Sequence, residues 1–298
     1  MKIIQCLACF LLMMNTSQIS AQYLPLYKKI PNYIAAPNEE AISDNGVYII
    51  SKVSVPAYTF FSAGEEGAPK PCVVICPGGG YGILASQHEG TDVANYFNSI
   101  GVHAVVLKYR IPSSANQIDK KFAPLQDAQK AIQLVRKNAR NWNVDPAKVG
   151  IMGFSAGGHL AASLATHYQD KQIKSGASLR PDFQILIYPV ISFGKFTHRG
   201  SRNNLLGKDT TAQYIDYFSN ELQVNAKTPK AFLVHAKNDM AVPIENSWMY
   251  RDALKKYGIP VQLFEFEKGG HGFGMINATS EIAWPSKLTE WLKQENIL

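Results

Sequence analysis

Short apolar runs alternate with amphipathic stretches over most of the chain. The run Cys72–Cys76 is apolar throughout, as is typical of a strand buried on both faces of a sheet. The longer stretch Pro124–Asn141 is amphipathic, with residues such as Ala128 and Ile132 on one helical face. Strands and helices that alternate in this way predict right-handed βαβ units around a mostly parallel sheet.

The same reading predicts the other elements of the sheet. Its strands are Cys72–Cys76, Val102–Tyr109, Lys148–Met152, Gln184–Tyr188, Ala231–Ala236 and Val261–Phe266. Its helices are Thr91–Ile100, Pro124–Asn141, one from Ala156 onward, Ile244–Tyr257 and Glu281–Leu292. We expect two further strands, Val47–Val53 and Pro56–Phe61, to pair antiparallel at an edge. The prediction is an α/β fold with a mostly parallel central sheet of about eight strands, flanked by helices on both faces.

Residues 1–21 have the pattern of a signal peptide. Lys2 supplies a positive charge, Ile3–Met14 are mostly apolar, and Ser20-Ala21 offer small residues for cleavage. The apolar run is too short to span a bilayer, which takes about 20 residues. We therefore expect export to a periplasm or the cell exterior, with no membrane span in the mature chain.

The rest of the chain is expected to form one domain. Residues 22–46 are rich in Pro and Asn and predict an irregular N-terminal arm, whereas residues 47–298 carry the alternating pattern. Residues 192–229 interrupt that pattern. They form either a cap or loop insertion beside the site or an excursion with no role in binding.

Charge and cysteine content exclude several classes of protein. The formal net charge is +7, but the basic residues are scattered, which argues against nucleic-acid binding. Cys72 and Cys76 lie four residues apart on one strand, about 13 Å, which is too far for a disulfide. We interpret both as small core residues. No His or Glu spacing indicates a zinc or calcium site, and no cofactor is expected.

The pentapeptide Gly153-Phe-Ser-Ala-Gly157 is the strongest chemical signal. It follows a predicted strand and precedes a predicted helix, which is the context of a nucleophile elbow. Such a turn is strained and leaves little room for neighbouring side chains, so glycine is favoured two residues to either side of the serine. Ser155 is therefore the candidate nucleophile.

Chain order selects the partners of Ser155. A serine hydroxyl needs a base, usually a histidine oriented by a carboxylate, and in this fold the acid and then the histidine follow the serine. Asp239 lies in the loop after the strand Ala231–Ala236, and His271 is the only histidine that follows it. His271 lies among glycines, which offer no core for its ring to pack into. We predict a Ser155–Asp239–His271 triad.

A glycine-rich loop after the Cys72–Cys76 strand is the candidate oxyanion hole. Consecutive glycines can point backbone N–H groups into a pocket. We predict Gly79 and Gly80 as donors together with Ala156, the residue after the nucleophile. A phosphate-binding reading fails, because neither G-x-x-x-x-G-K nor G-x-G-x-x-G is present.

Other polar residues have mainly structural interpretations. Tyr81, beside the glycine loop, either lines an acyl pocket as a substrate-binding residue or packs in the core. Arg110 and Asp127 are expected to pair beneath the site. His159 is expected to be a buried histidine with satisfied hydrogen bonds, and His235 a residue at the end of its strand.

Several motifs resemble known families. Pro77-Gly-Gly-Gly80 is similar to the His-Gly-Gly-Gly motif of the hormone-sensitive-lipase-like esterases, and Lys108-Tyr-Arg-Ile-Pro112 to their Asp-Tyr-Arg-Leu-Ala-Pro segment. This chain departs from the first motif at Pro77, which occupies the position of the histidine. More narrowly, four segments resemble the bacterial acetylxylan/feruloyl esterase group, the BD-FAE-like α/β-hydrolases: Val53-Ser-Val-Pro56, Cys76-Pro-Gly-Gly-Gly-Tyr81, Glu89-Gly90 and Gly153-Phe-Ser-Ala-Gly-Gly-His159.

This resemblance implies a secreted serine esterase that deacetylates plant polysaccharides such as xylan, with feruloyl esters as an alternative. The expected partner is an esterified carbohydrate or another small ester. A serine peptidase of the prolyl-oligopeptidase type shares the triad order, but residues 22–46 are too short for the large propeller such enzymes carry. A catalytically silent carbohydrate-binding protein is the alternative of another class, and the complete predicted triad argues against it.

Overall fold

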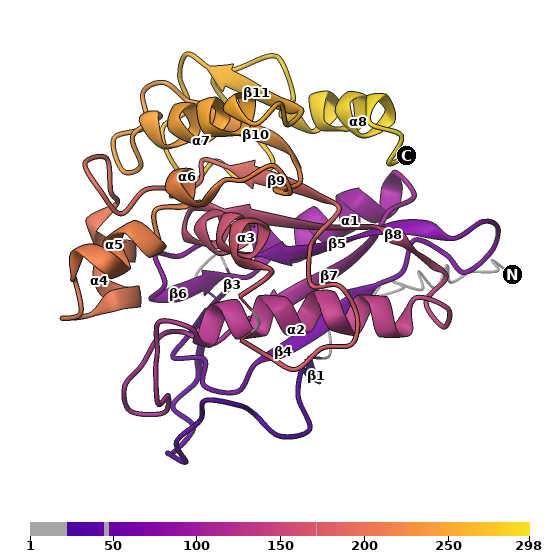
Figure 1. Cartoon of the computed structure of the whole chain (residues 1–298). Helices are drawn as coiled ribbons and strands as arrows, with labels where there is room; N and C mark the ends of the chain where they lie inside the picture. The colour runs from indigo at the N-terminus through magenta and orange to yellow at the C-terminus, as the bar shows by residue number, and fades with distance from the viewer. Residues whose placement is uncertain (1–22, 45–47, 171) are drawn as a thin grey trace, which may run out of the picture.

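An eight-stranded sheet runs through the centre of the molecule (Figure 1). The structure is a computed structural model that describes residues 23–44, 48–170 and 172–298. In spatial order the strands are β1 (Leu24–Pro25), β4 (Ala57–Phe61), β7 (His103–Lys108), β5 (Lys70–Cys76), β8 (Val144–Phe154), β9 (Phe183–Ile187), β10 (Lys230–Ala236) and β11 (Val261–Phe266). The strands from β7 to β11 are parallel, and β4 and β1 pair antiparallel at one edge. The predicted mostly parallel sheet is confirmed.

Helices cover both faces of this sheet, as predicted. One face carries α2 (Ala123–Asn138), α3 (Ser155–His167) and α7 (Glu245–Lys256), and the other carries α1 (Asp92–Ser99) and α8 (Trp284–Gln294). Along β5, Cys72 and Val74 pack into the core of the first face, and Val73 and Ile75 into that of the second. Because both faces are covered, the buried run Cys72–Cys76 of this strand has no position for a polar side chain.

The predicted pairing of Val47–Val53 with Pro56–Phe61 is wrong. β3 (Tyr48–Ser51) instead lies between β2 (Ala41–Asp44) and β6 (Ile83–Ala85) in a separate antiparallel sheet, whereas β4 pairs with β7. Lys52 adopts a left-handed φ of 53° between the two strands. The chain therefore turns out of the small sheet before it enters the large one.

The N-terminal arm is irregular over most of its described residues but contains the short strands β1 and β2. β1 extends the central sheet, with Leu24 opposite Tyr58. Farther along, the Tyr27 hydroxyl donates to the carbonyl oxygen of Gln126 at the start of α2 (2.9 Å). The arm is thus tied to the domain. The predicted signal peptide, residues 1–21, lies outside the described residues.

The segment 192–229 folds into three short helices, α4 (Arg199–Leu206), α5 (Ala212–Tyr217) and α6 (Asn220–Gln223). Leu205 and Phe218 anchor it in the core beside α3. Cys72 and Cys76 are buried free thiols, as predicted. In the part of the chain that the structure describes, no helix combines the length and apolar character needed to cross a membrane.

Candidate active site

The candidate nucleophile lies where β8 ends and α3 begins. Ser155 follows Phe154 directly and adopts a left-handed φ of 50°. A Cβ on Gly153 would lie 2.0 Å from the carbonyl oxygen of Gly157, and one on Gly157 would lie 2.1 Å from that of Cys76. Only glycine fits at either position. These close approaches press α3 against β5 and hold the strained turn that exposes the serine hydroxyl to a cavity.

Two loops at the carboxyl ends of neighbouring strands bring His271 and Asp239 to Ser155. His271 follows β11, and its Nε2 lies 2.8 Å from Ser155 Oγ. Its Nδ1 lies 2.6 Å from Oδ2 of Asp239, which follows β10. An ionised carboxylate only accepts hydrogen bonds, so Nδ1 carries the proton and Nε2 accepts the serine hydroxyl proton. The structure therefore joins the three predicted residues in one hydrogen-bonded chain.

The carboxylate of Asp239 is almost fully buried. Its Oδ1 accepts the backbone N–H groups of Ala241 and Val242, both at 2.9 Å. Its Oδ2 faces His271 and also lies 3.2 Å from Nε2 of His235. Burial alone would raise the pKa of Asp239, but the hydrogen bonds from His235 and His271 outweigh it and hold the pKa well below its usual range. Asp239 is ionised at neutral pH.

The glycine loop after β5 lies beside Ser155. The N–H of Gly78 donates to Oε2 of Glu89 (2.7 Å), which leaves Gly79 and Gly80 as the next amides of the loop. Among the hydrogen bonds of the described residues, none uses the N–H of Gly79 or Gly80. Their φ values, 129° and 63°, are accessible to glycine at little cost. Ala156 lies in the first turn of α3, where N–H groups have no partner within the helix.

A cavity of about 240 Å³ opens over these groups. It is lined by Gly79, Gly80, Ala85, Glu89, Ser155, His198 and His271. His198 comes from the segment 192–229, which therefore reaches the site. Its Nδ1 accepts the N–H of Ser201 (3.2 Å), and burial, with the nearby His271, lowers the pKa of His198. The ring is neutral and keeps Nε2–H as a donor.

Tyr81 does not line this cavity. It is buried, and its hydroxyl pairs with Nδ1 of His159 at 2.9 Å. Of the two sequence interpretations, core packing describes its surroundings. His159 also donates from Nε2 to the carbonyl oxygen of Phe218 (2.8 Å), so it is a buried histidine with satisfied hydrogen bonds, as expected. Arg110 and Asp127 form the expected ion pair (2.8 Å).

Sequence reasoning missed several residues of the site. The sequence pattern places His235 only at the end of its strand, although the four-residue spacing from Asp239 is a usable signal. Glu89 had no assigned role beyond a family motif. No local sequence pattern marks Tyr188 or His198 as site residues, because they reach the site only through the path of the chain after β9 and before α4.

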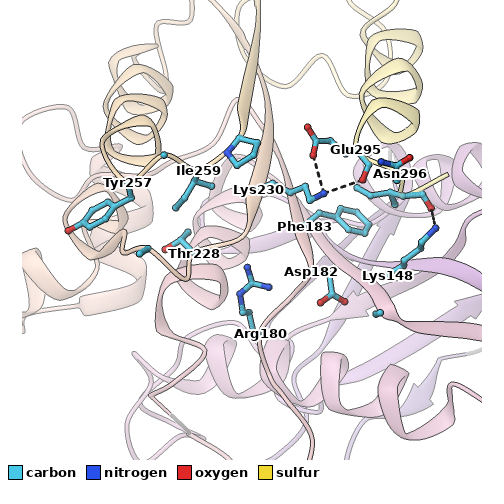
Figure 2. A pocket seen from close by; sticks show the side chains of 15 residues that line it. Lys148, Arg180, Asp182, Phe183, Thr228, Lys230, Tyr257, Ile259, Glu295 and Asn296 are labelled. Atoms are coloured by element: carbon cyan, nitrogen blue, oxygen red, sulfur yellow. Dashed lines mark hydrogen bonds and ion pairs between the residues drawn. The ribbon is translucent and has the colours of Figure 1, made fainter.

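A larger cavity, about 520 Å³, lies at the opposite end of the sheet (Figure 2). It is lined by residues before β9 and β10 and after α8, among them Arg180, Asp182, Lys230 and Glu295. None of the triad residues reaches it, so chemistry rather than volume identifies the smaller cavity as the candidate site. In residues 23–44, 48–170 and 172–298, no group of three or more His, Cys, Asp or Glu side chains is arranged to hold a metal ion.

The parallel sheet covered on both faces, with a serine at its strand–helix turn, defines an α/β-hydrolase. A solved acetyl ester-xyloside bifunctional hydrolase from Caldicellulosiruptor lactoaceticus has the same fold, with a TM-score of 0.80 and 34% identity over 93% of this chain and 97% of that one. The chain belongs to the BD-FAE family, whose model matches residues 60–254.

Two curated relatives are similar to the chain. One is the endo-1,4-beta-xylanase B of Butyrivibrio fibrisolvens, 38% identical over 74% of this chain. The other is the acetylxylan esterase of Xylanibacter ruminicola, 37% identical over 68% of this chain. The matches span 35% and 41% of the lengths of those two proteins, so only part of each is similar to this chain.

Proposed function

We propose that the protein is a serine esterase that removes acetyl groups from a plant polysaccharide such as xylan, with Ser155, His271 and Asp239 as its catalytic residues. The observation that carries the proposal is the unbroken hydrogen-bonded chain from Asp239 through His271 to Ser155, in a cavity that also holds two unpaired loop amides. These are the parts that acyl transfer requires.

The proposed reaction has two steps. His271 Nε2 takes the proton of Ser155 as Oγ attacks the ester carbonyl, and Asp239 stabilises the imidazolium that forms. The N–H groups of Gly79, Gly80 and Ala156 bind the oxyanion of the tetrahedral intermediate. His271 then protonates the leaving alcohol. Water attacks the acyl-enzyme with His271 again as base, which releases the acid and restores Ser155.

The size of the cavity and the relatives support a short acyl group. A cavity of about 240 Å³ is smaller than the typical site for a drug-sized ligand, roughly 300–1,000 Å³, and suits an acetyl group better than a bulky aromatic acid. One relative is named an acetylxylan esterase, and the solved structure is named an acetyl ester-xyloside hydrolase. A feruloyl ester is the alternative substrate. The signal-peptide pattern of residues 1–21 supports export to where such polysaccharides occur.

One experiment tests the function. Purified protein and Ser155→Ala are incubated with acetylated xylan, feruloylated arabinoxylan and a panel of peptides, and acetate, ferulate and new amino termini are measured. We expect acetate release by the wild type, and a rate at least about 10³-fold lower for the variant. If only ferulate is released, the substrate is a feruloyl ester and not an acetyl ester. If peptides are cleaved, the protein is a peptidase and not an esterase. No turnover of any ester, including an activated acetate, would contradict the esterase proposal.

A further inference from the structure

Glu89 is a buried carboxyl group in the wall of the catalytic cavity, and it takes no part in the proposed two-step reaction. It lies in a π-helical turn, Gln87–Thr91, before α1, and its side chain is 4% exposed. Burial raises the pKa of Glu89, and the hydrogen bond from Tyr188 offsets only part of that effect. A carboxyl group in such a place costs folding free energy unless its partners compensate. This combination indicates a role in function.

One oxygen of Glu89 holds the oxyanion loop. Oε2 accepts the N–H of Gly78 at 2.7 Å. A Cβ on Gly78 would lie 2.5 Å from this oxygen and 3.1 Å from Cβ of Ser155. Gly78 is therefore wedged between the carboxylate and the nucleophile, one residue before the amides of Gly79 and Gly80.

The other oxygen of Glu89 leads to the histidine loop. Oε1 accepts the hydroxyl of Tyr188 at 2.7 Å, and the same hydroxyl accepts the N–H of Gly274 at 3.0 Å. The ring of Tyr188 lies 4.8 Å from that of His271, centroid to centroid. Tyr188 itself has a left-handed φ of 36°, an uncommon conformation for a bulky residue that its surroundings must stabilise.

We propose that Glu89 is a positioning residue: it fixes the oxyanion loop against Ser155 and, through Tyr188, fixes the loop that carries His271. The inference rests on the proposed esterase function. The chain Gly78–Glu89–Tyr188–Gly274 joins three segments that are far apart in sequence, so one carboxylate keeps the oxyanion donors and the base in register. The nearby His88, with Nε2 at 3.7 Å from Oε1, is the cationic partner when protonated.

The first test is the kinetics of Glu89→Gln on an activated acetate ester. The amide keeps the size of the side chain but removes the charge and has one accepting oxygen, so it can keep the Gly78 N–H only if its own N–H group faces the Tyr188 hydroxyl, which reverses that hydrogen bond. We expect kcat to fall about 10- to 100-fold, somewhat less than the loss of an oxyanion donor itself, with KM within about threefold. A purely structural role would lower the melting temperature without this split between kcat and KM.

Asp182→Asn is the matched control. Asp182 is a partly buried carboxylate whose pKa is also raised by burial, and it too accepts a backbone N–H, that of Val149 (2.8 Å). It lies at the end of the sheet opposite the catalytic cavity. We expect this variant to lose stability and keep the wild-type kcat.

The second test is a double-mutant cycle with Tyr188→Phe, which removes only the hydroxyl. If Glu89 and Tyr188 act through one chain, the double variant loses less kcat than the product of the two single losses. Tyr188→Phe alone carries the test if Glu89→Gln does not fold, with an expected loss of about tenfold. Independent, multiplicative losses, or wild-type kcat in both single variants, would overturn the inference. Wild-type protein inactive on every ester would instead overturn the proposed function.

Discussion

Both carboxylate oxygens of Asp239 have polar partners in the candidate site. Backbone N–H groups bind one carboxylate oxygen, and two histidine rings face the other. His235 is itself fixed by Ser247, whose Oγ lies 2.7 Å from its Nδ1. The charge that orients His271 is thus stabilised by groups on several sides, and this stabilisation contributes to folding as well as to the proposed catalysis.

Asp239→Asn is expected to lose stability in a pH-dependent way. The folded-state pKa of Asp239 is depressed, so its contribution is present above the unfolded value of about 3.9 and is lost as pH falls through the folded value. We expect the free energy of unfolding at pH 7 to fall by about 1–3 kcal/mol, and the difference from wild type to shrink toward pH 3 and below. Urea denaturation at both pH values measures it.

Ser155→Ala is the control for this prediction, because it removes a triad residue without a charge at neutral pH. Its difference from wild type is expected to be the same at both pH values. A difference for Asp239→Asn that stays constant or grows toward acid pH would contradict the assigned sign.

Chain order selects the three residues of the proposed triad, which the structure brings into hydrogen-bond contact: one histidine follows Asp239, and Asp239 follows a clear strand. It does not predict the second layer of contacts. Glu89 and Tyr188 are 99 residues apart, and no local pattern links a carboxylate before α1 to a tyrosine after β9. For Tyr81 the sequence leaves two interpretations open, and only the folded chain shows that its side chain packs in the core.

At the scale of elements, the junction of β8 and α3 depends on backbone contact with β5. The carbonyl oxygens of Cys76 and Pro77 lie where a side chain on Gly157 would be. Glycine is therefore required at position 157 for α3 to pack against β5. This packing in turn fixes the geometry of Ser155.

Gly157→Ala is expected to damage both stability and activity. Its Cβ would lie 2.1 Å from the carbonyl oxygen of Cys76, so α3 must move away from β5. We expect the free energy of unfolding to fall by about 3 kcal/mol, the upper part of the range for overpacked sites, and esterase activity to fall with it. Thermal or urea unfolding and an ester assay measure the two effects.

Gly176→Ala is the matched control, because a Cβ there meets nothing within 4 Å and φ is not left-handed. It is expected to be neutral or slightly stabilising. Equal behaviour of the two alanine variants would show that the close approach at Gly157 is relieved at little cost.

Element prediction succeeded for the buried strands and failed for the small sheet. The parallel strands from β7 to β10 each contain a run of buried apolar residues because both faces of the sheet are covered there, and that signal is local. β2, β3 and β6 are only three or four residues long, and their pairing depends on a turn at Lys52 and on the path of the glycine loop. Such pairing is a property of the folded chain and is not visible in the pattern of any one strand.

For the molecule as a whole, Arg110 joins three parts that the sequence treats as separate. Its guanidinium binds Asp127 on α2, donates to the carbonyl oxygen of Pro31 in the arm (2.8 Å) and to that of Ala123 (3.1 Å). Both charged side chains of the pair are fully buried. The ion pair therefore anchors the arm and α2 to the strand end that follows β7.

Asp127→Asn is expected to lower the free energy of unfolding by about 3–5 kcal/mol, because it leaves the Arg110 charge buried without a carboxylate. The pair does not line the catalytic cavity, so the kcat of the folded variant is expected to stay within about threefold of wild type. Glu290→Gln, which breaks the exposed pair with Lys287, is the control and is expected to cost less than about 1 kcal/mol. Equal losses in the two variants would contradict the role assigned to burial.

The two buried thiols of β5 can report which part of the protein opens, because a thiol reacts only when it is exposed. Burial raises the pKa of both Cys72 and Cys76, so neither is reactive until the sheet exposes it. Cys76 immediately precedes the glycine loop, and Cys72 lies four residues deeper along the same strand. Faster alkylation of Cys76 than of Cys72 would therefore indicate local opening beside the glycine loop, whereas equal rates would indicate global unfolding of the core.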